Sequence, residues 1–346
     1  MLDIEEVWYS DQYKQLREEL QNKLCFITFG GSHAYGTNVE DSDIDIRGVM
    51  LPTVQELIGL NHFEQKLDEQ TDTCIYSFMK FVNLARDANP NVIEMLGCRE
   101  YLVFNEVGEM LLDSVKHFLS KRCAVTFGGY AVAQLRRIEN ALCHDEFTEE
   151  QQNKHIMETI NATIAKLDER YPIFKDNQIE VVQKEEKLYI NANIKECRID
   201  EFREAFNSIL DIERTYNKLN KRNDKKTPEK MNKHIMHLVR LYLMCFDILE
   251  KGELITYRPE REFLLEIRNG KFLKDGKLTE DFYPYLDSLK ERLDKAVAES
   301  TLPSKPNFDA LNKLVVEVHT KVINDTVKTY RDTVNDTVKP LKEVIV

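Results

Sequence analysis

Two short stretches near the N-terminus decide the fold: Gly30-Gly31-Ser32-His33-Ala34-Tyr35-Gly36 and Asp41-Ser42-Asp43-Ile44-Asp45-Ile46-Arg47-Gly48-Val49. The first stretch directly follows Leu24–Phe29, a continuous apolar run with β-branched and aromatic residues. An apolar run that ends at a glycine pair predicts a buried strand followed by a tight turn. We therefore expect a rigid strand to hold the glycine-rich stretch in place.

The second stretch predicts a strand over residues 43–50, in which successive side chains point to opposite faces. Asp43 and Asp45 then share one face, while Ile44 and Ile46 enter the core from the other. Two neighbouring carboxylates raise each other's pKa, and a bound divalent cation removes that penalty. Carboxylate oxygens suit Mg²⁺ or Mn²⁺, and two such ions can position a hydroxyl and stabilise a leaving pyrophosphate.

The glycine-rich turn fits the same chemistry, because a turn after a buried strand presents backbone N–H groups to an anion. Ser32 adds a hydroxyl donor, and Gly31 and Gly36 allow close approach or a positive φ. Each signal alone has an ordinary explanation, since an Asp-x-Asp is more often a solvated strand edge and a Gly-Gly-Ser is usually only a turn. The spacing is more specific: Gly31-Ser32, ten residues, then Asp43-x-Asp45.

This spacing resembles the signature of the DNA polymerase β nucleotidyltransferase superfamily. The longer strings are similar to the bacterial and phage group of RNA-repair-pathway, or YcgL-type, nucleotidyltransferases. The similarity continues through residues 72–78 and 89–96 and is looser afterwards. His33 stands where that group commonly has arginine, a departure that leaves the expected metal ligands intact.

The resemblance implies transfer of a nucleoside monophosphate from an NTP to an acceptor hydroxyl, with release of pyrophosphate. It implies that Asp43 and Asp45 bind two Mg²⁺ or Mn²⁺ ions. A third carboxylate on a neighbouring strand would bind the catalytic ion and act as general base. Asp72 is the best match for it, with Asp68 and Glu69 as competitors.

Nucleotide contacts are expected from Gly31, Ser32 and Tyr35. Asn89, Asn91 and Glu94 either line the pocket or cap a helix, and the cap is the simpler interpretation.

A later helix over residues 229–251 carries a basic stripe. Thr227 and Pro228 suit its start and Gly252 its end. The stripe, at i, i+3, i+7 and i+10, consists of Lys230, Lys233, His237 and Arg240. It is either an ordinary solvated face or a cationic wall facing the triphosphate, and a similar pattern in the family favours Lys233, His237 and Arg240 as nucleotide contacts.

The fold expected from these patterns is α/β (α+β), with a small mixed sheet and flanking helices followed by a mostly helical domain. We expect a nucleotidyltransferase domain over residues 1–105, a helical domain that closes over the nucleotide over 106–300, and a helical tail over 301–346. Helical spacing covers residues 107–119, 125–142, 149–170 and 199–220, and residues 179–194 suit a short hairpin. A sequence repeat with an 11-residue offset predicts that the tail is one long helix, which packs on the body or on a second copy.

Composition sets limits on the function. The net charge of −12 argues mildly against a long nucleic acid as partner, because phosphate binding needs clustered Lys and Arg. The seven cysteines lack a C-x-x-C pair, and no signal peptide or membrane span is evident, so we expect a cytoplasmic protein with reduced thiols. Three acceptor hypotheses stay open: an RNA end such as tRNA, a protein as in antitoxin-type members, or no acceptor in a regulatory nucleotide-binding protein.

Overall fold

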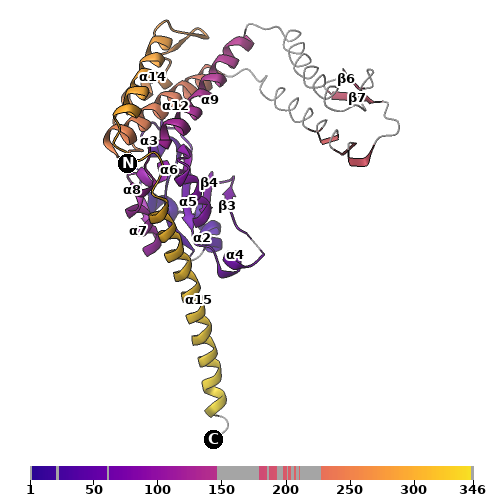
Figure 1. Cartoon of the computed structure of the whole chain (residues 1–346), viewed down its shortest axis with the longest axis vertical. Coiled ribbons are helices and arrows are strands. Elements are labelled where there is room, and N and C mark those ends of the chain that lie inside the picture. Colours follow the sequence, from indigo (N-terminus) through magenta and orange to yellow (C-terminus); the bar gives the residue numbers. More distant parts are fainter. Residues whose placement is uncertain are drawn as a thin grey trace. The chain divides into compact units, whose positions relative to one another are not determined.

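The computed structural model describes residues 2–20, 23–60, 62–145, 179–184, 187–192, 198–200, 202–203, 206–207, 210 and 227–343 (Figure 1). By packing, the chain divides into two compact units, Met1–Leu135 with Asn232–Val346, and Arg136–Met231. The domain boundaries expected near residues 105 and 300 stay predictions, because packing alone does not say which segments fold independently.

The strands are β1 (Leu24–Phe29), β2 (Ile46–Met50), β3 (Gln65–Asp68), β4 (Thr73–Ser77), β5 (Tyr101–Val103), β6 (Ile179–Lys184), β7 (Lys187–Ala192), β8 (Leu273–Lys274) and β9 (Lys277–Leu278). The α-helices are α1 (Ile4–Trp8), α2 (Lys14–Leu20), α3 (Gly31–Tyr35), α4 (Val54–Ile58), α5 (Phe78–Arg86), α6 (Pro90–Ile93), α7 (Glu106–Asp113), α8 (Val115–Phe118), α9 (Arg122–Asp145), α12 (Pro228–Phe246), α13 (Arg261–Arg268), α14 (Phe282–Glu299) and α15 (Phe308–Glu343). Among the described residues there are also two 3-10 turns, η1 (Asp11–Tyr13) and η2 (Glu94–Gly97), and one π-helical turn, η4 (Asp247–Lys251).

Five strands form one mixed sheet in the order β3-β4-β2-β1-β5. β2 and β4 run parallel, and the other neighbouring pairs are antiparallel. All six residues of β1 are buried, as its continuous apolar run predicts. This mixed sheet, followed by a mostly helical region, confirms the fold class expected from the sequence.

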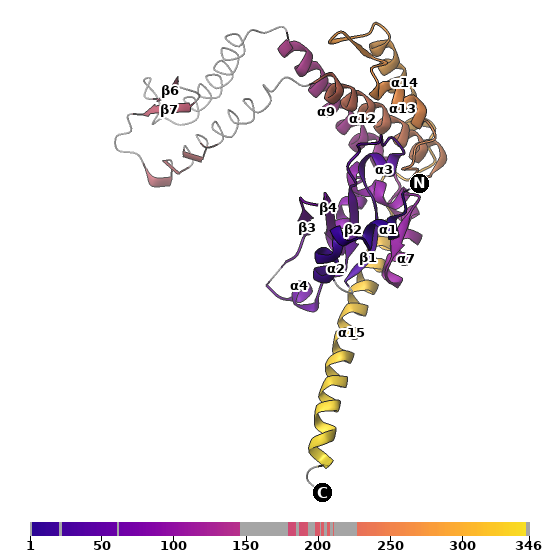
Figure 2. The ribbon, with the colours of Figure 1, turned by 180° about the vertical axis from the view of Figure 1, so that it is seen from behind.

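Helices cover both faces of the sheet. On one face lie α1 and α2 (Figure 2). Trp8 of α1 and Tyr13 of η1 join Ile27 and Ile46 there in one apolar cluster. On the other face, α5 packs on β2 and β4, and α7 packs on β1. There Phe26 meets Phe81 edge to face, with 6.0 Å between ring centroids. β2 is therefore anchored from both sides, so the residues at its start are held firmly.

The predicted strand over residues 43–50 is wrong at its start, because β2 begins at Ile46. Ile46 pairs with Phe29, the last residue of β1, and α3 starts at Gly31. Because β1 ends at Phe29, the residues before Ile46 have no residue of β1 with which to pair. One contact continues in line with the sheet: Gly30 N–H donates to the carbonyl of Asp45 at 2.8 Å. The short strand β5, which extends the sheet beside β1, has no counterpart among the predictions.

Local signals elsewhere are mostly confirmed. β6 and β7 form the antiparallel hairpin predicted within residues 179–194. Thr227 Oγ1 accepts from Lys230 N–H at the start of α12, and Gly252 follows η4 with a φ of 67°. The helix predicted over 107–119 is broken into α7 and α8, whereas α9 covers the helix predicted over 125–142. The helix expected over 149–170 and most of 199–220 lie outside the described residues.

The tail helix α15 is continuous from Phe308 to Glu343, as predicted. Leu311, Leu314 and Val318 in its first part are buried. Its role as an oligomer contact stays a prediction.

Candidate active site

The parallel pairing of β2 with β4 brings two acidic residues side by side. Ile46 pairs with Thr73, so the residues just before them, Asp45 and Asp72, are also neighbours. Ile46 N–H donates to the carbonyl of Asp72 at 3.3 Å, which fixes this register. The catalytic carboxylates predicted on neighbouring strands thus meet at the edge where both strands begin.

Successive side chains of residues 44–47 point to opposite faces of the sheet, and this alternation decides which of them lie near Asp72. Ile46 is buried in the cluster beneath α1 and α2, and Ile44 packs against the same cluster. Asp45 and Arg47 point to the opposite face. Arg47 Nη2 lies 3.2 Å from Asp45 Oδ1 and 3.6 Å from Asp72 Oδ1, and Arg47 Nη1 donates to the Asp72 carbonyl at 2.8 Å. Ile44 and Ile46 are therefore separated from Asp45 as predicted, although residues 43–45 precede the strand, whereas the shared face predicted for Asp43 stays a prediction.

The site carries more negative than positive charge. Burial, the hydrogen bond with Asp72 and the charges of Asp72 and Asp43, opposed by the Arg47 guanidinium, together raise the pKa of Asp45 to about 6. Asp43 is exposed, and the side chain of Asp72 is 63% exposed. A cluster of hard oxygen donors with uncompensated charge fits a divalent cation. Nevertheless, in the described part of the chain no three or more His, Cys, Asp or Glu side chains are already arranged to hold a metal ion.

Gly31, the first residue of α3, lies against Asp45. Its φ is +53°, and a Cβ at this position would stand 1.9 Å from Asp45 Oδ2. Only glycine permits this approach without a shift of the carboxylate. Ser32 follows within α3, and its carbonyl accepts from Thr37 N–H at 2.9 Å. The glycine-rich stretch is thus a short helix that starts directly beside the acidic residues.

Asp68 and Glu69, the two alternatives to Asp72 as third carboxylate, have different surroundings. Asp68 Oδ1 accepts from the backbone N–H groups of Gln70 and Thr71, at 2.9 and 3.3 Å, and so closes the turn between β3 and β4. Glu69 is exposed in that turn. Asp72 itself has a φ of 44°, unusual for a residue other than glycine. Of the three, Asp72 is the one that contacts Arg47 together with Asp45.

A pocket of about 470 Å³ opens over this face of the sheet. We call it the acid pocket; it is lined by Gly31, Tyr35, Arg47, Gln65, Leu67, Asp68, Glu69, Asp72, Thr73, Cys74, Tyr76, Asn91 and Glu94. Its volume is in the usual range for a site that binds a small molecule or cofactor.

One wall of the acid pocket rests on a buried network. Tyr35 Oη donates to Glu94 Oε1 at 2.7 Å, and Arg240 Nη1 donates to Glu94 Oε2 at 2.9 Å. The Arg240 guanidinium also lies 3.6 Å from the centre of the Tyr35 ring. Both Glu94 oxygens are therefore engaged, and Arg240 is only 3% exposed.

The burial of Arg240 fits neither interpretation of the basic stripe on α12, as a solvated face or as a cationic wall that faces the triphosphate. Arg240 points inward to Glu94, and the ring of His237 meets Tyr35 edge to face at 6.4 Å. Burial and the neighbouring Arg240 charge lower the pKa of His237 to about 3, so it is neutral. Lys233 is half-buried and Lys230 is exposed. The four residues do not form one open cationic face.

A family model, the RNA repair pathway DNA polymerase beta family (RlaP), matches residues 7–317. The chain belongs to this family. No match was found among curated proteins or among solved structures. Membership confirms the resemblance seen in the sequence, and it links the chain to nucleotidyltransferases, a superfamily that typically uses divalent metals. No helix in the described part of this family member is both long and apolar enough to span a membrane.

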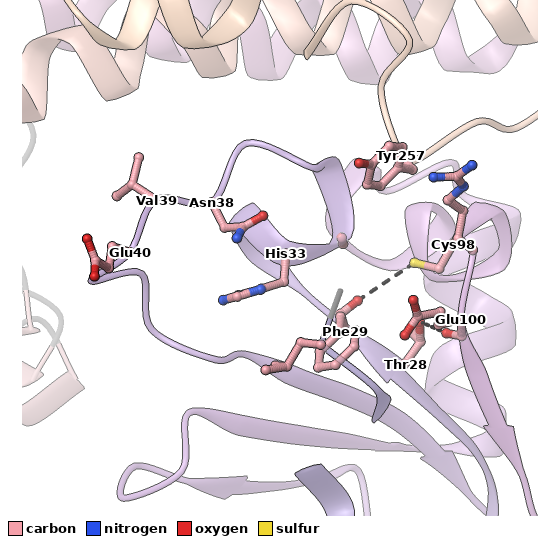
Figure 3. Close-up of a pocket in the computed structure, with 12 residues that line it drawn as sticks. Thr28, Phe29, His33, Asn38, Val39, Glu40, Cys98, Glu100 and Tyr257 are labelled. Atoms are coloured by element: carbon pink, nitrogen blue, oxygen red, sulfur yellow. Dashed lines mark hydrogen bonds between the residues drawn. The ribbon is translucent and has the colours of Figure 1, made fainter. Parts of the chain in front are cut away.

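A second pocket in this family member, of about 570 Å³, lies beside α3 (Figure 3). We call it the aromatic pocket. Phe29, His33 and Tyr257 contribute its rings, and Arg99 stacks on Tyr257 at 4.4 Å. Gly36, with a φ of +73°, makes room for Tyr257. The aromatic pocket is larger than the acid pocket, but none of Asp43, Asp45 and Asp72 lines it. Of these three residues, Asp72 alone lines the acid pocket, where Arg47 and Gly31, which contact or lie against Asp45, also line the wall.

Arg47 has no role among the sequence predictions, and for Glu94 they leave two roles open, lining the pocket or capping a helix. Arg47 follows Asp45 at a spacing of two, so alternation was a signal that it shares the acidic face. Asn89 caps α6 as expected, by accepting from Asn91 N–H, whereas Glu94 and Asn91 both line the acid pocket. The partners of Glu94 come from distant segments, for which the sequence carries no local signal.

Proposed function

We propose that this chain is a metal-dependent nucleotidyltransferase that moves a nucleoside monophosphate from an NTP to an acceptor hydroxyl. The observation that carries this is the meeting of Asp45 and Asp72 at the start of two parallel strands, directly beside the glycine at the start of α3. Membership of the RNA repair pathway DNA polymerase beta family supports the reaction class.

In this proposal, Asp43, Asp45 and Asp72 hold two Mg²⁺ or Mn²⁺ ions. When bound, such ions polarise the phosphate and stabilise the leaving pyrophosphate. The exposed carboxylate of Asp72 takes the proton from the acceptor hydroxyl. The acceptor oxygen bonds to the α-phosphorus, the bond from that phosphorus to the bridging oxygen breaks, and pyrophosphate leaves.

Gly31 and Ser32 bind the phosphates through backbone N–H groups and the serine hydroxyl. Tyr35 and Arg240 support this contact from behind, since both are tied to Glu94 and Tyr35 is the last residue of α3. His237 packs on the same tyrosine. Lys233 is the remaining candidate from α12 for a direct nucleotide contact.

The acceptor that we favour is an RNA end, because the family is described as acting in RNA repair. Protein nucleotidylation is the alternative, favoured by the net charge of −12. The test is incubation with each α-³²P-labelled NTP and Mg²⁺, together with either total RNA or cell lysate. Asp45→Asn and EDTA serve as controls.

Label in RNA supports the favoured acceptor, and label in a protein band supports the alternative. Label that is equally strong with Asp45→Asn or EDTA would contradict the assigned site. Absence of any label, while the protein still binds NTP, would indicate a regulatory nucleotide-binding protein instead.

A further inference from the structure

In the part of the chain that the structure describes, Arg47 is the one side chain of opposite charge that contacts both Asp45 and Asp72. Its side chain is 25% exposed and lines the acid pocket. Besides the two carboxylates it contacts two carbonyls, those of Ile46 at 3.2 Å and Asp72 at 2.8 Å. These contacts place a positive charge where the proposed function requires a metal ion.

The guanidinium and a divalent ion need the same oxygen atoms. Arg47 Nη2 donates to Asp45 Oδ1 at 3.2 Å, and Asp72 Oδ1 lies within 3.6 Å of the same nitrogen. A guanidinium that donates to these oxygens competes with a metal ion for their lone pairs, and the repulsion between the two cations grows as the local dielectric constant falls. Binding of the metal at Asp45 and Asp72 therefore requires Arg47 to move.

The displaced guanidinium has the acid pocket in front of it. The buried carboxylate there, Glu94, already uses both oxygens for Tyr35 and Arg240. An incoming phosphate group presents oxygen atoms that match the planar fork of an arginine. Asp68 and Glu69 also line the pocket, but Asp68 accepts from the backbone of the β3–β4 turn and Glu69 is exposed, so the nucleotide adds the anion that suits the guanidinium fork.

We propose that Arg47 alternates between two anions: it holds Asp45 and Asp72 in the metal-free protein and binds the triphosphate once metal has taken their place. This rests on the proposed function. A purely structural role, in which Arg47 merely ties β2 to β4 through the two carbonyls, makes different predictions for metal affinity.

The test measures Mn²⁺ binding by electron paramagnetic resonance, without nucleotide, for wild type and Arg47→Gln. Removal of the competing cation makes Mn²⁺ binding tighter, by about tenfold, which corresponds to about 1.4 kcal/mol. Arg99→Gln is the matched control: it removes an arginine from the aromatic pocket and leaves Mn²⁺ affinity unchanged. Equal or weaker Mn²⁺ binding by a folded Arg47→Gln protein would overturn the inference.

The second measurement is ATP affinity in the presence of Mn²⁺. Arg47→Gln loses the phosphate contact, so its ATP affinity falls by about tenfold while its metal affinity rises. Arg47→Lys keeps the charge but loses the fork, and it retains near-wild-type Mn²⁺ affinity with weaker ATP binding. If Arg47→Gln does not fold, Arg47→Lys provides the test. Unchanged ATP binding by Arg47→Lys together with altered Mn²⁺ affinity contradicts the inference.

Asp45→Asn separates this inference from the proposed function. If wild type binds Mn²⁺ and Asp45→Asn does not, the metal site stands and the Arg47 variants judge the inference alone. If wild type and all variants fail to bind Mn²⁺, both the metal-dependent function and the role of Arg47 fall.

Discussion

Two clusters of arginine and carboxylate lie at the two ends of α3, one beside Gly31 and one at Tyr35, and differ in charge balance. The open cluster of Asp43, Asp45, Arg47 and Asp72 has three carboxylates and one guanidinium, which contacts Asp45 and Asp72, and the Asp72 side chain is 63% exposed. In the closed cluster of Tyr35, Glu94 and Arg240, one carboxylate meets one guanidinium, and both are nearly buried. In the closed cluster both Glu94 oxygens have donors and the charges balance, whereas the open cluster has surplus negative charge beside the acid pocket, which Asp72 and Arg47 line. We infer that the closed cluster holds α3 in place and propose that the open cluster does the chemistry.

The largest expected effect lies in the open cluster. Asp45→Asn should lower nucleotide transfer by about a thousandfold or more, because a metal ligand that stabilises the transition state is lost. The far-ultraviolet circular dichroism spectrum should stay unchanged. Activity within about tenfold of wild type, measured by label transfer, would remove the distinction between the clusters.

The closed cluster should respond in stability. Glu94→Ala leaves Arg240 buried without its carboxylate, and loss of one partner of a buried pair costs about 3–5 kcal/mol. Urea unfolding measures this free energy. Asp72→Asn is the matched control from the open cluster, and its stability should change by less than about 1 kcal/mol since exposed pairs contribute little. Equal destabilisation by both variants would contradict the comparison.

Gly31 connects the two clusters, because α3 runs from Gly31 beside Asp45 to Tyr35 in the closed cluster. Gly31→Ala should displace Asp45, lowering activity strongly and stability by about 1–3 kcal/mol, from strain at positive φ and steric overlap. Gly129→Ala in α9 is the control, because nothing lies within 4 Å of the new Cβ. There a gain of about 0.5–1 kcal/mol is expected from helix propensity.

The smallest effect concerns pH in the absence of metal. The pKa of Asp45 in the folded protein, about 6, lies above its unfolded value, so the folded state binds a proton more tightly. Its contribution to stability is fully present below about pH 4 and is lost as the pH rises through 6.

Asp45→Asn escapes this loss. Its unfolding free energy in EDTA, relative to wild type, should therefore increase by about 1–2 kcal/mol between pH 4 and pH 7. Added Mg²⁺ should reduce the difference by stabilising wild type. A difference that is independent of pH would show that Asp45 is not held at a raised pKa.

Much of the site was predictable from the residues near it. Alternation around Asp43-Ile44-Asp45-Ile46 predicted which side chains enter the core, and Ile44 and Ile46 share one cluster as expected. The same alternation would have included Arg47. The start of β2 was not predictable, because it depends on where β1 ends as its partner.

The stripe on α12 shows the opposite case. Its spacing correctly places His237 and Arg240 on a common side of the helix, but spacing does not reveal what that side faces. Arg240 turned out to pair with Glu94, which is 146 residues away in the sequence.

The sequence by itself determined the features whose signals are local: the buried strand β1, the glycine pair that ends it, the caps at Thr227 and Gly252, and the alternation of aspartate with isoleucine. It predicted a turn where the structure has the short helix α3. The tertiary structure alone decided that β4 lies parallel to β2, which makes Asp72 rather than Asp68 the neighbour of Asp45, and that Glu94 receives Arg240. The physical reason is that periodicity and capping act within one segment. Strand register and charge pairing depend instead on which distant segments pack against each other and exclude water from between them.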